Sequence, residues 1–69
     1  MASVKVIVPW AQIESAQAKS MIFRAARAEF GSGFSLEFRP GGWIVIDHEK
    51  NVYEVMDIED GFDFLPQED

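Results

Sequence analysis

The chain has 69 residues, a formal net charge of -6 and no cysteine, and 48% of its residues are hydrophobic. It is too short for two hydrophobic cores and too apolar to stay unfolded, so these values predict one small domain, residues 1–69. The absence of cysteine excludes disulfides, thiolate metal sites and cysteine nucleophiles. Its apolar stretches are far shorter than the ~20 residues that cross a membrane, and its first residues do not resemble a signal peptide. We therefore expect a cytoplasmic protein.

The charged residues are distributed unevenly along the chain. Residues 1–46 carry five basic and three acidic side chains, a balance of +2. Residues 47–69 carry one basic and nine acidic side chains, a balance of -8. An acidic C-terminal third repels phosphate, which argues against direct binding of nucleic acid. It attracts a basic protein surface, so the sequence favours a protein partner of that kind.

The N-terminal half predicts a strand followed by a helix. Valines alternate with other residues over Ser3–Val8, and Pro9 ends the strand because proline cannot donate to a sheet. The helix is predicted over Gln12–Phe30, beginning either near Pro9 or later with Ser15 as its N-cap, and Gly31 ends it. Apolar residues share one broad face of this helix: Ala18, Met21, Ile22, Ala25, Ala26 and Phe30.

Three strands separated by short turns are predicted after the helix. Phe34–Arg39 alternates apolar and polar side chains, as a strand with one buried face does. Trp43–His48 is apolar on both faces, which is typical of a central strand. Val52–Ile58 is the last clear strand. Short turns join antiparallel neighbours, so these strands should form a meander.

The two turns of this meander decide its details. At residues 40–42, a two-residue loop would pair Phe38 with Trp43, whereas a three-residue loop would pair Phe38 with Ile44 and exchange the two faces of the strand. Both registers remain open at the level of sequence. Residues 49–51 form the second turn, in which Asn51 is the residue suited to left-handed backbone.

The predicted fold is a single α+β domain with the order β-α-β-β-β. An antiparallel meander carries one helix on one face, and the N-terminal strand reaches the sheet edge. Residues 59–69 form an acidic, aromatic tail. Phe62 and Phe64 either add a short strand or pack as a hook against the domain.

No motif in the chain predicts catalysis or a cofactor. His48 is the single histidine, and no second histidine or cysteine can complete a zinc site with it. No serine lies in the sequence context of a nucleophile. Residues 57–63 superficially resemble a calcium loop, but they lack the alternating oxygen ligands and the closing glutamate. We therefore expect a non-enzymatic protein without a metal.

The candidate partner-binding site lies where acidic and aromatic residues are interleaved near the C-terminus. Aromatic side chains anchor interfaces, and carboxylates complement a basic target. Trp43 is included among the predicted partner-binding residues because it follows two glycines and because its indole N–H would need a hydrogen-bond partner if it were buried. The predicted partner-binding residues are Glu54, Asp57, Glu59, Asp60, Asp63, Trp43, Phe62 and Phe64. The alternative for the two phenylalanines is that they fold onto the core of this protein.

In size, acidity and element order over Val4–Ile58, the chain resembles small phage-encoded inhibitory proteins, including anti-CRISPR proteins. No motif carries this resemblance, so it assigns no residue roles. It implies stoichiometric binding to a host complex in the host cytoplasm. There, acids at positions 54–63 would occupy a basic nucleic-acid channel as phosphate surrogates.

The sequence thus predicts a non-catalytic protein-binding inhibitor of a host nucleic-acid-processing complex. The alternative is a small homo-oligomeric structural or assembly protein, a homodimer in the simplest case. The apolar character of both faces of Trp43–Ile46 motivates that alternative, because a second copy could cover the uncovered face.

Overall fold

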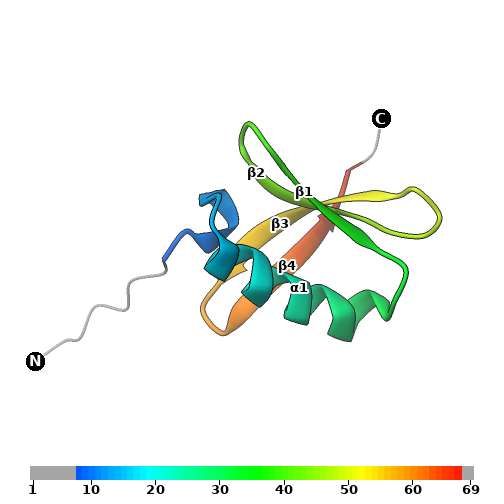
Figure 1. The fold of residues 1–69 in the computed structure, drawn as a ribbon, viewed down its shortest axis with the longest axis horizontal. Helices are drawn as coiled ribbons and strands as arrows, with labels where there is room; N and C mark the ends of the chain where they lie inside the picture. The colour runs from blue at the N-terminus through cyan, green and yellow to red at the C-terminus, as the bar shows by residue number, and fades with distance from the viewer. Residues whose placement is uncertain (1–7, 68–69) are drawn as a thin grey trace, which may run out of the picture.

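The computed structural model describes residues 8–67, which form one α-helix, a short 3-10 helix and a four-stranded antiparallel sheet (Figure 1). The α+β class is therefore confirmed. The elements in chain order are a short 3-10 helix η1 (Trp10–Gln12), α1 (Ala16–Phe30), β1 (Ser35–Arg39), β2 (Gly42–Ile46), β3 (Val52–Ile58) and β4 (Gly61–Pro66). No helix within the described residues is long and apolar enough to cross a membrane.

Helix α1 begins at the later of the two predicted starts. The Ser15 side chain accepts a hydrogen bond from the Ala18 N–H at 3.1 Å, which satisfies one of the free donors of the first turn. The residues around Pro9 form the separate helix η1 instead. At the other end, Gly31 adopts φ 74° and donates its N–H to the Arg27 carbonyl, as predicted for a helix-terminating glycine.

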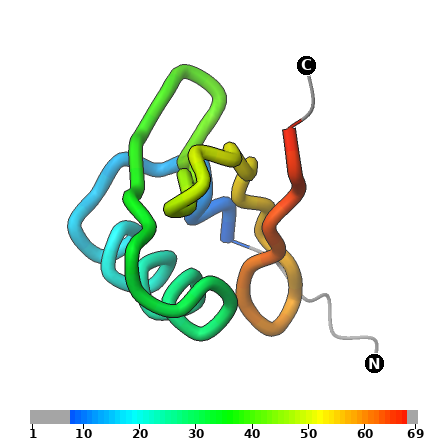
Figure 2. The backbone as a smooth tube through the Cα atoms, turned by 90° about the vertical axis from the view of Figure 1, so that its right-hand side faces the viewer, coloured from blue at the N-terminus to red at the C-terminus, as the bar shows by residue number. Residues whose placement is uncertain are grey.

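The sheet is a meander with the strand order β1-β2-β3-β4. The first hairpin takes the register of the two-residue loop, because Phe38 lies opposite Trp43 and Arg39 lies opposite Gly42. Figure 2 shows the β1–β2 hairpin and β4 on opposite sides of the view, as expected for the two edges of one sheet.

The turn between β2 and β3 differs from its prediction in one respect. Lys50, and not Asn51, has left-handed backbone, with φ 70°. Asp47 and Asn51 face each other across the turn, since the Asp47 N–H donates to the Asn51 carbonyl at 3.0 Å. This hydrogen bond closes the turn just beyond the last ladder pair, Ile46↔Val52, and the left-handed position lies one residue before Asn51, at Lys50.

The element order also differs from the predicted β-α-β-β-β. Most of the predicted strand Ser3–Val8 lies outside the described residues, and its last residue, Val8, is in no strand. All four described strands follow the helix. The fourth is β4, which occupies most of the predicted tail and pairs with β3 along its length, from Tyr53↔Pro66 to Ile58↔Gly61. The short-strand alternative for Phe62 and Phe64 is thus correct.

The core lies between α1 and one face of the sheet. Ile22 and Ala26 of α1 and Val45 of β2 are fully buried there, together with Val55 of β3. Aromatic rings close its rim: Phe30 lies 4.7 Å from the ring of Tyr53 between centroids. One face of the sheet therefore packs against the helices, and the opposite face is the candidate binding surface.

Candidate functional site

The second face of the sheet is covered by no described element, and we call it the open face. Both η1 and α1 contact the core side: Ala11 and Ile22 belong to the core cluster with Val45 and Val55. Side chains alternate along a strand, and cross-strand partners point the same way, so the register assigns the open face. Its side chains are Ser35, Glu37, Arg39, Ile44, Ile46, Val52, Glu54, Met56, Ile58, Asp63 and Leu65.

The open face carries a strip of apolar side chains on three strands, which Glu54 interrupts and in which Ile44 is buried. Ile44 of β2 and Leu65 of β4 flank position 54 of β3, and Met56 and Ile58 follow along β3. Met56 is 46% exposed and Ile58 is 42% exposed, although both side chains are large and apolar. An exposed apolar strip with a polar rim is typical of a surface that binds another macromolecule.

Carboxylates border this strip. Glu54 lies between Ile44 and Leu65 in the ladder, and Asp63 lies opposite Met56. Glu54 and Asp63 are diagonal neighbours, so two negative charges face solvent on adjacent strands. The turn after β3 adds Glu59 and Asp60 at the end of the strip. Of these four predicted site residues, the fold makes Glu54 and Asp63 neighbours, and Glu59 and Asp60 lie in the turn that joins their two strands.

Asp57 is separated from the other predicted acids, because it points to the core side. Its two carboxylate oxygens accept the backbone N–H of Ala11 at 3.0 and 3.1 Å. Ala11 is 2% exposed, so this contact satisfies a buried donor and fixes η1 to β3. The structure thus gives Asp57 a folding role, which a local sequence pattern could not reveal.

The three predicted aromatic anchors also lie on the core side. The expectation that Trp43 lies at the surface is wrong: it is 5% exposed, and its indole N–H donates to the Ile13 carbonyl at 2.7 Å. Phe62 and Phe64 pack against the core cluster, with Phe64 edge-on to Phe30 at 5.2 Å. Their assignment to the core is the alternative that the sequence left open. None of the three contributes to the open face.

The sequence analysis missed Met56, Ile58 and Leu65 as site residues. The alternation over Val52–Ile58 does indicate that Glu54, Met56 and Ile58 share one face of the strand. It was not decisive, because the sequence did not say which face α1 would cover. Met56 and Ile58 read equally well as core residues until the helix was placed.

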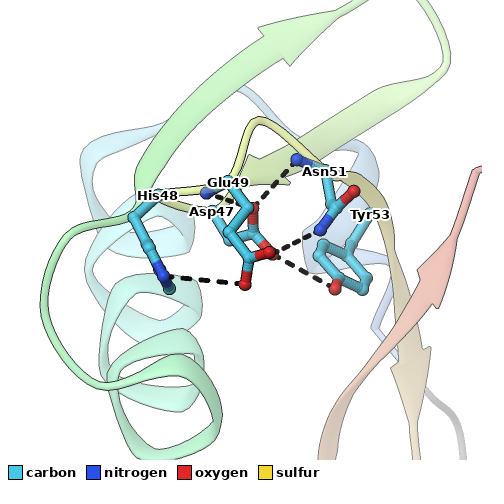
Figure 3. A network of polar contacts seen from close by, with 5 residues as sticks. All are labelled: Asp47, His48, Glu49, Asn51 and Tyr53. Atoms are coloured by element: carbon cyan, nitrogen blue, oxygen red, sulfur yellow. Dashed lines mark hydrogen bonds and ion pairs between the residues drawn. The ribbon is translucent and has the colours of Figure 1, made fainter.

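Asp47 organises the turn between β2 and β3 (Figure 3). One carboxylate oxygen accepts the N–H groups of Glu49 and Asn51, both at 2.9 Å. The other accepts the Asn51 side-chain amide at 3.2 Å and the Tyr53 hydroxyl at 3.3 Å. His48 makes only a 3.7 Å contact with Glu49 at the surface. The network closes a turn and presents no activated nucleophile.

The pKa values in this network follow from these contacts. Partial desolvation acts to raise the pKa of Asp47, but the hydrogen bonds from Asn51, Glu49 and Tyr53 outweigh it and lower the pKa below its ordinary value. Desolvation and the neighbouring Asp47 charge raise the pKa of Tyr53. Within residues 8–67, no three histidine or acidic side chains are grouped closely enough to hold a metal ion.

A shallow hollow of about 540 Å³ lies along β2, between the β1–β2 turn at one end of this strand and the β2–β3 turn at the other. Residues of both turns and of the first halves of β2 and β3 line it. Ile44 and Val52 supply apolar walls, and Arg39, Lys50 and Glu54 supply charge. The open face therefore combines an apolar strip, an acidic border and a hollow in which basic side chains occur.

Comparison with protein-family models, curated proteins and solved structures found no match for this chain.

Proposed function

We propose that the protein is a non-catalytic inhibitor that binds a basic, nucleic-acid-binding surface of a host complex through its open face. The observation that supports this most is the exposure of Met56 and Ile58 beside Glu54 and Asp63 on a face without a described cover. Apolar contact supplies affinity, and the carboxylates select a basic target. A basic protein surface meets both requirements.

The target class follows from the charge. A channel that binds nucleic acid is lined by lysine and arginine, and carboxylates spaced along a strand can occupy the places of phosphates. Residues 47–69, which include this border, carry a balance of -8. The resemblance in size and acidity to small phage-encoded inhibitors, including anti-CRISPR proteins, favours a phage origin and a bacterial host complex.

The experiment is capture from bacterial lysate on immobilised protein at low and high salt, followed by elution with duplex DNA or RNA. The test variant is Glu54→Gln with Asp63→Asn. Its matched control, Glu14→Gln with Glu29→Gln, makes the same change of net charge outside the sheet. We expect the captured complex to dissociate with salt or added nucleic acid. We also expect about three- to tenfold weaker capture by the test variant alone.

Equal capture by the test and control variants would contradict the acidic open face as the binding surface. A complex that withstands added DNA and RNA would contradict a nucleic-acid-binding target. The test omits Asp57, because its substitution would destabilise the fold and could imitate a loss of binding.

A small homo-oligomeric assembly protein is the second candidate. The exposed Met56 and Ile58 also favour it, since a second copy could cover them, and β1 and β4 are the edges of the sheet that residues 8–67 form. Sedimentation velocity distinguishes the two candidates. A dimer that persists at high salt and is lost on Met56→Asp supports assembly, whereas a monomer at all concentrations refutes it.

A further inference from the structure

The edge of the sheet at β1 leaves backbone groups of two residues without a partner strand. A strand in an antiparallel sheet bonds to its two neighbours through alternate residues. The Asp47 N–H donates to the Asn51 carbonyl just beyond β2, so the odd-numbered residues of β2 bond to β3 and the even-numbered ones bond to β1. Leu36 and Phe38 of β1 therefore direct their N–H and C=O groups away from β2. Within residues 8–67, no hydrogen bond uses these groups.

The opposite edge, at β4, is largely closed to strand pairing. The Gln67 N–H donates back to β3, so the odd-numbered residues of β4 also bond to β3. The outward residues are then Phe62, Phe64 and Pro66. The Phe64 N–H donates to a carboxylate oxygen of Asp63 at 3.0 Å, and proline has no N–H. Proline and charged side chains protect sheet edges in this way, so a strand would pair more readily with β1.

The charge of the chain also favours the β1 edge as a contact between copies. Residues 47–69, which include β4, carry a balance of -8, whereas residues 1–46, which include β1, carry +2. Pairing through β4 would bring two strongly negative regions together. Pairing through β1 keeps these regions at the far edges of the two sheets, where they repel each other least (Figure 2).

The side chains of β1 are complementary to a second β1 strand. In an antiparallel pair with its two-fold axis at Phe38, Glu37 of each copy lies opposite Arg39 of the other. Within one chain, Nη2 of Arg39 is already 2.9 Å from the Glu37 carboxylate, and a guanidinium has five N–H groups. Both pairs can therefore join into one balanced network across the axis. The same axis pairs the outward N–H of each Phe38 with the Phe38 carbonyl of the other copy.

Apolar side chains gather on the core side of this edge. Leu36 and Phe38 are half-buried there and pack against the core cluster. Phe34 precedes β1, and its ring lies 5.0 Å from that of Phe23 in α1. Phe23 is 45% exposed, so α1 covers this side of the core incompletely. A two-fold axis perpendicular to the sheet keeps both helices on one side, where the apolar edges of two copies cover each other.

We propose that the protein forms a symmetric dimer in which β1 pairs antiparallel with β1 of a second copy, so that the two sheets become one. The dimer does not depend on the proposed function, because its contact is the edge of the sheet and not the open face. It leaves both open faces uncovered and on the same side of the joined sheet. Each dimer thus presents two copies of the candidate binding surface to a partner, and binding through both would gain from their linkage.

The experiment is sedimentation equilibrium of the full chain up to about 1 mM protein, where even a weak dimer is half formed. Amide hydrogen exchange of the ¹⁵N-labelled chain is followed over the same concentrations. We expect a concentration-dependent dimer, in which exchange of the Phe38 amide becomes at least about tenfold slower when most of the protein is dimeric. The Phe62 amide is the control, because it faces outward on β4 and should keep the same rate.

Variants test the charge pairing across the axis. Arg39→Glu places only carboxylates there, and we expect at least about tenfold weaker dimerisation. Glu37→Arg combined with Arg39→Glu restores opposite charges at both pairs and should return the dissociation constant to within about threefold of the wild type. Lys19→Glu makes the same change of net charge as Arg39→Glu but on α1, and Met56→Asp alters the open face. Both should retain the dimer. Thermal melts check that each variant is folded.

Four results would overturn the proposal. A monomer at every concentration would exclude the dimer, and a Phe38 amide that exchanges slowly at all concentrations would mean that another part of the chain covers the edge. Loss of the dimer in Met56→Asp but not in Arg39→Glu would mean that the second copy covers the open face. Equal weakening by Arg39→Glu and Lys19→Glu would mean that net charge alone controls association. None of these results decides the lysate capture, because a monomer also presents an open face.

Discussion

Replacement of Asp57 by alanine tests whether this acid serves the fold. In the structure, both carboxylate oxygens accept the N–H of Ala11, at 3.0 and 3.1 Å. Ala11 is 2% exposed, so water cannot readily take over the vacated position. Asp57→Ala would therefore leave a buried donor without an acceptor and would release η1 from β3.

The size of the effect follows from the kind of bond lost. Hydrogen bonds to a charged group contribute about 1.5–3 kcal/mol, and a buried donor without a partner costs a similar amount. A loss of about 2 kcal/mol in the free energy of unfolding is therefore expected. A chain of 69 residues loses about 4–8 °C in Tm for each kcal/mol, so Tm should fall by roughly 8–16 °C.

The assay is thermal unfolding followed by circular dichroism, with urea unfolding as a second probe. Asp57→Asn keeps an oxygen acceptor without the charge and should lose about half as much stability. Asp60→Ala is the matched control, because Asp60 is an exposed aspartate in the next turn and its loss should change stability by less than about 0.5 kcal/mol.

Equal Tm values for Asp57→Ala and the wild type would refute the assigned bond. Equal losses in Asp57→Ala and Asp60→Ala would show that overall charge, and not the contact with Ala11, determines the effect. Either result would support the sequence-based prediction that Asp57 belongs to the acidic partner-binding surface.

Three further predictions concern the sheet and its second turn. Gly42→Ala should lower the free energy of unfolding by about 2 kcal/mol or more in urea melts, because its Cβ would lie 2.6 Å from the Ala11 carbonyl oxygen. Trp43→Phe should cost about 1–3 kcal/mol in the same assay, because it removes the indole donor to the Ile13 carbonyl. The pKa of Asp47 is lowered in the folded state, so its contribution is present above its unfolded pKa and is lost as pH falls from about 4 through the folded value. Thermal melts against pH should show this loss, and Asp47→Asn should remove it.

Each of these predictions has an outcome that contradicts it. Gly41→Ala is the control for Gly42, since its Cβ would meet nothing within 4 Å, although its φ of 103° adds strain of its own. Equal destabilisation of the two would mean that backbone conformation alone decides. A Trp43→Phe protein as stable as the wild type would contradict the indole bond. An unchanged acid transition in Asp47→Asn would mean that other carboxylates dominate.

The sequence determined those features that depend on neighbours along the chain. Ser15 and Gly31 gave the ends of α1, because capping requires only the residues within one turn. The alternation over β1 and the short loop at Pro40 predicted a hairpin, because strand period and turn chemistry are local. The charge imbalance of residues 47–69 was also visible at once.

Only the tertiary structure decided which of these residues face solvent. The bond of Trp43 to Ile13 spans 30 positions, and that of Ala11 to Asp57 spans 46. A local sequence pattern cannot indicate a partner at such a distance, so Trp43 and Asp57 were both predicted to lie at the surface. The covered face of the sheet and the exposure of Met56 follow from how the helix and the strands pack. Packing depends on the whole chain, because a helix or a strand can bury its apolar face only against a second element of the fold.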